Sequence, residues 1–482
     1  MTADLIQKWC ETKPQAIALV TPQQNYTWQQ LDQHLDGVAK QLVSNGVQAG
    51  SIIALISKNE VEAVLLYLAS LRIGALCALM PPQPLPAVQQ KLSIIEADFV
   101  WLSAQIDALD TQQLGVSVLE LADAKSVSQE QLSLQERSSL QVQAFSHVFH
   151  PEQHASIVFT SGSTGVPKAV VHCAKHHLAS AQGLTEHFKF EAVDSWLLSL
   201  PMYHVSGLSI IWRWLEKGAQ MVIGTGDLFS DVQSVSYITH ASLVPIQLQR
   251  LLDSQQPLTL KRVLLGGSHI PLALTERAKQ QGIECWLGYG MTETASTVIA
   301  KQADGSPTAG FILPKRKFKL QGERIFVAGE TLAAGYLSQG QLMALVTAEN
   351  PWFDTKDLGK SHVFEDKSDE FEILGRADNQ FISGGENIHC EEIEAVLVRH
   401  PDIKQAFVIP VEDEKYGHRP IAFVDAHSNL DHDSYQAFLV QHLDKFKCPD
   451  VYYVLPESLM NTGIKISRAD LKTHYAQNHQ NS

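Results

Sequence analysis

The stretch IIALISKNEVEAVLLYLASLRIGALCALM, residues 52–80, decides the fold of this chain. Its start, Ile52 to Ile56, is a short apolar run that predicts a buried strand. From Glu60 to Leu71 the apolar residues recur at helical spacing, and Ala75 to Met80 is strand-like again before Pro81-Pro82. This strand–helix–strand order predicts a parallel sheet covered by helices.

The same rhythm returns later in the chain. Residues 221–223, 241–244 and 262–265 are strand-like, and residues 231–238 have helical spacing. After about Phe318 the pattern changes to short alternating strands, which predict a small antiparallel subdomain.

These patterns predict an α/β protein of two domains. We expect residues 1–377 to form a large N-terminal domain of two helix-flanked β-sheets plus a small antiparallel β subdomain. Residues 378–482 are expected to form a smaller α+β C-terminal domain, with the boundary near Asp378.

Composition narrows the classes of function. The chain has 482 residues, of which 45% are hydrophobic, so it can bury a core and exceeds one simple domain. It has 37 Lys and Arg against 52 Asp and Glu, a net charge of −15. A chain this acidic is a poor candidate for binding nucleic acid or anionic lipid.

The cysteines and the N-terminus predict a cytoplasmic protein. The six cysteines lie far apart without a CxxC pair, which is neither a disulfide framework nor a zinc pattern. No basic stretch followed by an apolar one opens the chain, so we expect no signal peptide. The most apolar region, residues 61–80, carries Glu62 and Arg72, and its charge-free runs are shorter than the ~20 residues that span a bilayer.

The most informative motif is IVFTSGSTGVPK, residues 157–168. Its glycines allow tight turns that expose successive N–H groups, and its hydroxyls and Lys168 add donors and charge for a polyphosphate. It is not a Walker A loop, because Pro167 precedes the lysine and Ala169 follows it. A flexible Ser/Gly loop is the structural alternative.

A second motif, GYGMTE, covers residues 288–293. Here Tyr289 is suited to stack on a base, Thr292 to bond a phosphate, and Glu293 to hold Mg²⁺, which prefers oxygen ligands. A strand-terminal turn with an exposed acid is the structural alternative.

Three further motifs are ambiguous when taken alone. Asp357 and Arg376 near strand ends suit a ribose and a phosphate, or form a surface salt bridge. The glycines of SGGENIH, residues 383–389, suit a mobile joint or close packing. Lys465, in NTGIKISR at residues 461–468, lies in a polar turn that also reads as a solvated basic loop.

In their order and spacing these motifs resemble the acyl- and aryl-CoA synthetases of the adenylate-forming superfamily. The patterns TSGSTGxPK at residues 160–168 and GRxDxxxxSGGENI at residues 375–388 carry the resemblance, which extends over essentially the whole chain to Lys465. It implies that a carboxylic acid attacks the α-phosphate of ATP, releasing pyrophosphate. Coenzyme A then attacks the acyl-adenylate and releases AMP.

The resemblance also assigns roles to single residues. The catalytic residues would be Lys465, which bridges carboxylate and α-phosphate, with Thr292, Glu293 and His204. Glu293 would hold Mg²⁺. The C-terminal domain would be mobile, with Asp378 as its hinge and the Gly384-Gly385 side facing the coenzyme A step. The nucleotide-binding residues would be Thr160, Ser161, Gly162, Ser163, Thr164, Gly165, Lys168, Gly266, Gly267, Tyr289, Asp357 and Arg376.

The sequence departs from the superfamily pattern at three positions, and the isoleucine before Lys465 marks a branch within it. Lys356 stands where a glycine is usual, Ile464 separates Gly463 from the lysine, and Cys390 replaces a frequent proline. The segments PMYHVSG at residues 201–207, WRW at 212–214 and TETASTV at 292–298 resemble the branch whose acid is 2-succinylbenzoate, in menaquinone biosynthesis.

That acid carries a second, aromatic carboxylate and a ketone, so its pocket needs donors or a cation beside an apolar wall. The resemblance points to His204, Arg213, Ser296 and Thr297 for this pocket. Arg213 between two tryptophans also reads as a packed helix residue, and His204 as a core histidine.

Other functions stay open at this point. The rivals are a ligase for another aryl or short-chain acid, an adenylating enzyme that loads a carrier protein, and a nucleotide-binding regulator without catalysis. The predicted partners are small molecules: the acid, ATP with Mg²⁺, and coenzyme A. Neither nucleic acid nor membrane insertion is expected, and the sequence leaves a homo-oligomer open.

Overall fold

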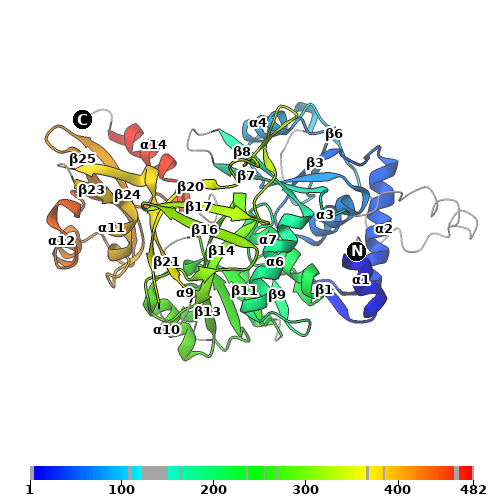
Figure 1. Ribbon diagram of the computed structural model, residues 1–482, viewed down its shortest axis with the longest axis horizontal. Coiled ribbons are helices and arrows are strands. Elements are labelled where there is room, and N and C mark those ends of the chain that lie inside the picture. The colour runs from blue at the N-terminus through cyan, green and yellow to red at the C-terminus, as the bar shows by residue number, and fades with distance from the viewer. Residues whose placement is uncertain are drawn as a thin grey trace, which may run out of the picture.

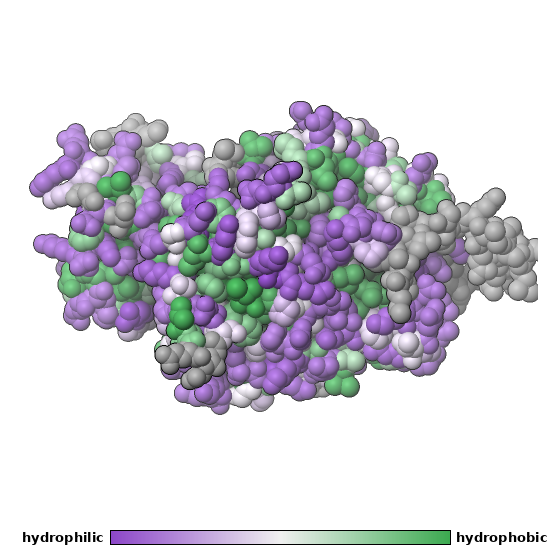
Figure 2. Space-filling model, viewed as in Figure 1, coloured by the Kyte–Doolittle hydropathy of each residue, from purple (hydrophilic) through white to green (hydrophobic). Residues whose placement is uncertain are grey.

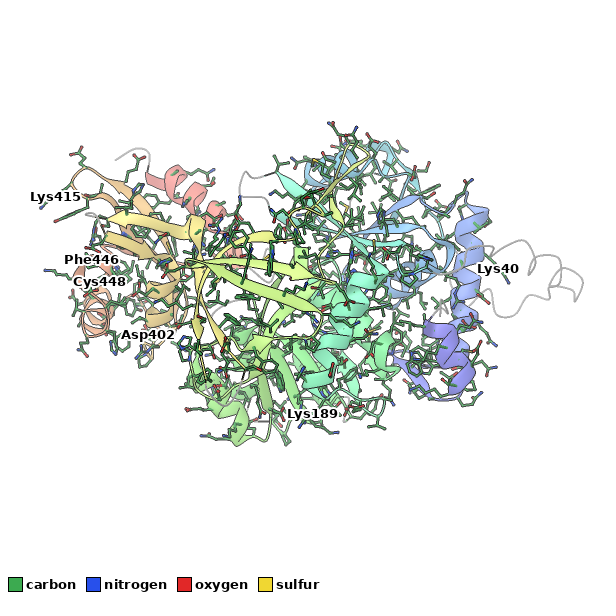
Figure 3. All side chains as sticks on the ribbon, in the orientation of Figure 1. Lys40, Lys189, Asp402, Lys415, Phe446 and Cys448 are labelled. Carbon is green, nitrogen blue, oxygen red and sulfur yellow. The ribbon has the colours of Figure 1, made fainter. Side chains whose placement is uncertain are left out.

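A computed structural model shows a large body of stacked sheets and helices, with a smaller unit at one end (Figure 1). Figure 3 shows Asp402, Lys415 and Phe446 in the smaller unit, opposite Lys40 in the large body. The structure describes residues 5–106, 111–121, 150–161, 166–234, 237–254, 256–267, 270–364, 368–383, 386–460 and 466–479.

The first large sheet has nine strands with a parallel centre and antiparallel edges. Its apolar central strands are buried on both faces, as expected for parallel strands between helices. In spatial order the strands are β15 (Phe311–Ile312), β14 (Ser296–Gln302), β13 (Glu284–Met291), β12 (Arg262–Leu265), β11 (His240–Leu243), β9 (Ser195–Leu197), β10 (Gln220–Val222), β1 (Ile17–Val20) and β2 (Asn25–Thr27).

The second large sheet has eight strands and contains the segment that decides the fold. Its strands β3 and β4 are parallel neighbours joined by the helix over residues 61–73, as the sequence predicts. In spatial order the strands are β19 (Gln341–Ala344), β18 (Gly335–Ser338), β8 (Pro167–Cys173), β7 (His154–Ser161), β4 (Leu76–Met80), β3 (Ile52–Ile56), β5 (Phe99–Leu102) and β6 (Ser117–Val118).

Helices fill the space between the two sheets and cover their outer faces. The largest core joins residues of both sheets to the inner helices α2 (Trp28–Ser44), α3 (Val61–Ile73), α6 (Ala174–Phe188) and α7 (Val205–Lys217). Separate cores pack the outer helices onto the opposite faces; these are α4 (Leu85–Ile95), α8 (Leu228–Ser234), α9 (Pro245–Asp253) and α10 (Leu272–Gln280).

The apolar region at residues 61–80 is therefore a core element. Most of α3 is buried, and no helix in the described part of the chain is long and apolar enough to cross a membrane. Hydrophilic residues cover most of the face in Figure 2, and hydrophobic ones gather near its middle. The N-terminal helix α1 (Leu5–Thr12) packs beside α2.

A four-stranded antiparallel sheet follows, as the alternating pattern after residue 318 predicts. Its strands are β16 (Arg316–Gln321), β17 (Arg324–Gly329), β20 (Phe353–His362) and β21 (Glu370–Arg376). A short turn, Ala377–Asn379, then leads into the smaller unit.

The smaller unit mixes a sheet with helices, as expected for the C-terminal part. Its strands are β22 (Gln380–Ser383), β23 (Glu386–His389), β24 (Ile403–Asp413), β25 (Gly417–Ala426) and β26 (Tyr452–Val454). Its helices are α11 (Cys390–Leu397), α12 (His432–Leu439), α13 (Glu457–Met460) and α14 (Arg468–His479). The predicted fold class is confirmed, whereas the boundary at residue 378 and the mobility of this unit stay predictions.

The helix expected over residues 231–238 is displaced. The helix α8 begins at Leu228 and ends at Ser234. Within it, the carboxylate of Asp231 accepts hydrogen bonds from the backbone of Thr225 (2.7 Å) and Gly226 (3.3 Å). The aspartate thus ties down the preceding turn, which moves the helix toward the N-terminus.

Glycine 207 tests the packing that places α7. A Cβ there would lie 2.1 Å from the carbonyl oxygen of Pro201 and 2.4 Å from that of Leu200. We expect Gly207→Ala to lower the free energy of unfolding by about 1–3 kcal/mol, because the backbone of both residues must shift. Urea denaturation measures the change.

The control is Gly282→Asn, at a position with φ +78° where a Cβ would have no other atom within 4 Å. Asparagine enters this left-handed region readily, so this variant should keep its stability. Equal stability of both variants would show that α7 does not depend on this close approach.

Candidate active site

The phosphate-loop motif lies on a hairpin at the edge of the candidate site. Strands β7 and β8 pair Thr160 with Lys168, and the chain turns between them. The Nζ of Lys168 lies 5.2 Å from the centre of the Tyr336 ring, and the side chain is exposed. Gly162, Ser163, Thr164 and Gly165 lie outside the described residues, as does the side chain of Ser161.

Tyr336 connects this lysine to the predicted metal-binding acid. Its hydroxyl donates to Glu293 Oε1 at 2.9 Å. Burial and the Glu293 charge both raise the pKa of Tyr336, so the phenol stays protonated and remains a donor. Tyr336 was not predicted as a site residue, because no motif surrounds it in the sequence.

Glu293 fits a site for Mg²⁺ shared with phosphate oxygens. The carboxylate is half-buried, and the backbone oxygen of the same residue accepts from Ala333 at 2.8 Å, which fixes the turn. Among the described residues no three His, Cys, Asp or Glu side chains gather as a metal site. A lone carboxylate matches Mg²⁺, which is often bound through one or two carboxylates plus substrate phosphates.

The backbone of the neighbouring Thr292 is hydrogen-bonded to a buried histidine. His172 Nε2 donates to the Thr292 carbonyl oxygen at 2.8 Å. Burial, and then the charge of His176, lower the pKa of His172 to about 3, so its ring is neutral. Its neighbour His177 shares a hydrogen bond of 2.8 Å with Ser156 Oγ. This support for Thr292 was also missed in the sequence.

Asp357 and Arg376, predicted to bind the ribose, form one hydrogen-bonded group with Tyr289, which is predicted to stack on the base. Tyr289 donates its hydroxyl proton to Asp357 Oδ2 at 2.6 Å, and Arg376 Nη1 donates to Asp357 Oδ1 at 3.1 Å. The same guanidinium forks onto both oxygens of Asp378, at 3.0 and 3.1 Å. Burial and the Asp357 charge raise the pKa of Tyr289 well above its usual range.

Lys356 has an unusual backbone conformation beside this group. Its φ is +60°, in the left-handed region that favours glycine. This geometry explains why a glycine is usual at this position of the motif, and the lysine accepts the strain. Asp357, paired with Arg376 across β20 and β21, keeps the place that the motif requires.

The two glycines after β12 lie beside β13. A Cβ on Gly266 would lie 3.1 Å from the carbonyl oxygen of Gly288, and Gly267 has φ +87°. Larger residues would crowd this strand end. The narrow gap places Gly266 next to the GYGMTE segment, where adenine is expected, and Gly267 faces Val244.

The predicted acid pocket centres on a buried arginine. Arg213 is 1% exposed on α7, and its carbon Cζ lies 5.1 Å from the centre of the Trp196 ring. Its Nη2 donates to Ser296 Oγ at 3.3 Å and its Nη1 to Ser242 Oγ at 3.4 Å.

Not every hydrogen-bond donor of Arg213 has a partner among the described residues. Its Nε has no hydrogen-bond partner among the described residues, and no carboxylate there pairs with it. Burial, and then the charge of Arg316, lower the pKa of Arg213 to about 9. The group is thus a cation at neutral pH, and an anion in this pocket would stabilise it.

His204 directly precedes the same helix, in the N-cap position but without a capping hydrogen bond from its side chain. Its ring lies 4.9 Å from that of Tyr203. Burial and the charge of Lys91 lower the pKa of His204, which therefore favours a neutral imidazole. Thr297 is buried at the start of β14, beside Ser296.

The described site residues therefore form three groups around one strand pair. Strand β13 carries Tyr289 and leads to Thr292 and Glu293, and β14 begins with Ser296 and Thr297. The hairpin, the Asp357 group and Arg213 approach from three other directions. Lys465, Gly384 and Gly385 lie outside the described residues, so their roles stay predictions.

Comparison with known protein families matches both parts of the chain. The model of the AMP-binding enzymes matches residues 6–337. The model of the AMP-binding enzyme C-terminal domain matches residues 392–464.

Individual proteins of known name and known structure are also similar to this chain. The chain is 39% identical over 474 residues to a 2-succinylbenzoate–CoA ligase from Salmonella typhimurium, which covers 98% of each chain. A variant of Escherichia coli MenE with bound OSB-AMS is similar with a TM-score of 0.86, 36% identity and 99% of each chain. The Bacillus subtilis o-succinylbenzoate CoA synthetase, in complex with the acyl-adenylate intermediate OSB-AMP, has a TM-score of 0.82, 25% identity and 98% of each chain.

The neutral His172 makes stability depend on pH. Unfolded histidine binds a proton near its usual pKa of 6.5, whereas folded His172 stays neutral down to about 3, so stability falls as the pH drops below 6.5. Between about pH 7.5 and about pH 5.5 this residue should account for about 1 kcal/mol of lost stability. We expect His172→Gln to lose that much less stability than the parent on acidification.

Urea denaturation at both pH values measures the effect. The matched control is His442→Gln, which replaces an exposed histidine and should keep the parental pH dependence. An unchanged pH dependence in His172→Gln would show that this ring titrates normally.

Proposed function

The chain belongs to the family of AMP-binding enzymes, and on this premise we propose that it activates 2-succinylbenzoate with ATP and transfers the acyl group to coenzyme A. The first step forms the acyl-adenylate and releases pyrophosphate. The second forms 2-succinylbenzoyl-CoA and releases AMP. The product belongs to menaquinone biosynthesis. The observation that carries the acid's identity is the buried Arg213 beside Ser296, which has no carboxylate partner among the described residues.

The first step must bring two anions together. A carboxylate is a poor electrophile, so the acid becomes reactive only after its oxygen attacks the α-phosphate. Developing charge is best stabilised by donors that are already in place. Lys168, on the hairpin, and Lys465 would supply cations for the phosphates and the attacking carboxylate, and Thr292 a hydroxyl donor.

The remaining nucleotide contacts follow from the geometry of the Asp357 group. Asp357 would accept from the ribose hydroxyls while Arg376 and Tyr289 hold its carboxylate in place. Glu293 would hold Mg²⁺, which when bound neutralises part of the phosphate charge. Tyr336 orients that carboxylate through its hydroxyl.

The acid pocket separates the two ends of the substrate. His204, at the start of α7, would lie by the carboxylate that reacts, and Arg213 with Ser296 and Thr297 would bind the aromatic carboxylate. A guanidinium suits this task because it forks onto both oxygens of a carboxylate. Since burial strengthens the interaction, one such contact can select the acid.

The second step needs a different arrangement of the C-terminal part. A turn about Asp378 would withdraw Lys465 and bring the Gly384-Gly385 side toward the adenylate. The thiol of coenzyme A then attacks the activated carbonyl, so no cysteine of the chain is required. All six cysteines are free, which agrees with the expected cytoplasmic compartment. A homo-oligomer remains compatible with this scheme.

Pyrophosphate release tests the choice of acid. We expect 2-succinylbenzoate to exceed 4-oxo-4-phenylbutanoate, which lacks the aromatic carboxylate, by at least about 100-fold in kcat/KM, because the analogue leaves Arg213 unpaired. In Arg213→Lys this preference should fall by about 10-fold or more, since an ammonium cannot fork onto the carboxylate. Benzoate and fatty acids complete the panel.

The surface variant Arg277→Lys is the control, because Arg277 pairs with Asp253 away from the site. A parental preference for benzoate or a fatty acid would contradict the proposed substrate. An unchanged preference in Arg213→Lys would contradict the role of Arg213.

Lys465 separates the two half-reactions. We expect Lys465→Ala to lower adenylate formation by about 100-fold or more, because the charge on the attacking carboxylate and α-phosphate is no longer neutralised. Conversion of supplied acyl-adenylate and coenzyme A to thioester should stay within about 3-fold of the parent. Equal loss of both half-reactions would contradict the turn about Asp378.

A further inference from the structure

A second arginine, Arg316, is buried next to the acid pocket but has no donor left over. It is 6% exposed at the start of β16. Its Nε donates to Thr297 O at 3.0 Å, its Nη1 to Pro314 O at 2.7 Å and to Ala179 O at 3.3 Å. Its Nη2 donates to Ser180 O at 3.0 Å and Ser180 Oγ at 3.1 Å. All five donors of the guanidinium are therefore used.

These contacts surround a strained turn. Ala295 has φ +50° and Ser296 has φ +95°, although neither is glycine. Such a backbone is energetically unfavourable and persists only where its surroundings enforce it. Strained backbone of this kind is concentrated at ligand-binding and active sites.

Two hydroxyls hold the turn directly. Ser180 Oγ donates to Ala295 O at 2.6 Å, and Thr294 Oγ1 donates to Ser296 O at 2.8 Å. Arg316 in turn donates to Ser180 on one side and to Thr297 on the other. The arginine thus holds both flanks of the turn through its rigid fork.

The turn determines where the pocket's donors lie. The hydroxyl of Ser296 accepts from Arg213 Nη2 at 3.3 Å, so a movement of Ser296 moves this hydrogen bond between Arg213 and β14. The two guanidinium groups also differ in whether all of their donors have hydrogen-bond partners. Arg316 is saturated by carbonyl and hydroxyl oxygens, whereas Arg213 keeps an Nε without a partner in the described part of the chain.

We propose that Arg316 is a positioning residue for substrate selection: together with Ser180 it holds the strained turn at Ala295–Ser296, and the turn presents Ser296 and Arg213 to the aromatic carboxylate of the acid. The inference rests on the proposed function, because it needs that carboxylate to lie against Arg213. Arg316 itself does not touch the substrate. Its loss should weaken recognition of one end of the acid and leave the nucleotide site intact.

Two variants test this proposal with two acids. Ser180→Ala removes the hydroxyl that holds Ala295, and Arg316→Lys keeps the charge but loses the fork. We expect each to lower kcat/KM for 2-succinylbenzoate by about 10- to 100-fold, mainly through a higher KM, because small displacements of binding groups have effects of this size. The values for 4-oxo-4-phenylbutanoate should change by less than about 3-fold, and the KM for ATP should stay parental.

The control is again Arg277→Lys, a surface arginine in an ion pair with Asp253. Thermal unfolding of every variant shows whether the fold is kept, and Ser180→Ala decides the matter if Arg316→Lys does not fold. An equal loss with both acids, or a raised KM for ATP, would show a purely structural role and overturn the proposal.

The outcomes also separate this proposal from the proposed function. If the parent does not prefer 2-succinylbenzoate over 4-oxo-4-phenylbutanoate, the proposed function fails and this inference falls with it. If the parent and the Arg213→Lys variant behave as proposed but Ser180→Ala keeps the parental preference, only the role of Arg316 and Ser180 is refuted.

Discussion

The acid pocket depends on one constraint, the burial of the charged guanidinium of Arg213. A charge removed from water costs several kcal/mol unless partners compensate it. Here the described partners are an aromatic face and two hydroxyls at 3.3 and 3.4 Å, which are long hydrogen bonds. The fold tolerates this because tryptophans on both sides of Arg213 are buried in the largest core. In the proposed function an arriving carboxylate would complete the arrangement, so the feature that costs stability would also select the substrate.

The nucleotide site differs from the acid pocket, because its charged groups already have hydrogen-bond partners within the site. Glu293 accepts from Tyr336, and Asp357 accepts from both Tyr289 and Arg376. These bonds orient the side chains before any ligand arrives, which is the arrangement expected of a site that stabilises developing charge. The groups come from three different sheets, and the end of β13 is where they meet. Activation of an acid by ATP requires such convergence, because one triphosphate must be held from several sides.

Local sequence patterns predicted much of the fold and part of the candidate site. The strand–helix–strand unit at residues 52–80 is found as expected, and the motifs around Glu293, Asp357 and Arg376 lie together. Arg213 was indicated only by the resemblance, because its local pattern between two tryptophans equally fits a packed helix residue. The left-handed backbone of Lys356 explains why a glycine is usual at this position of the motif.

The missed residues share one property. Tyr336, His172 and Arg316 act through hydrogen bonds to residues 43, 120 and 19 positions away, and no motif surrounds them. Their roles follow from tertiary packing, which single-sequence patterns do not encode. Helix α8 was displaced for a related reason, because the carboxylate of Asp231 binds the turn before the helix.

The most direct test of this account is a crystal structure with a stable analogue of the 2-succinylbenzoyl-adenylate. The account predicts the ribose against Asp357, and the aromatic carboxylate within about 3 Å of Arg213 and Ser296. A ligand whose aromatic carboxylate points into solvent, with Arg213 still bound only to Ser242 and Ser296, would contradict it.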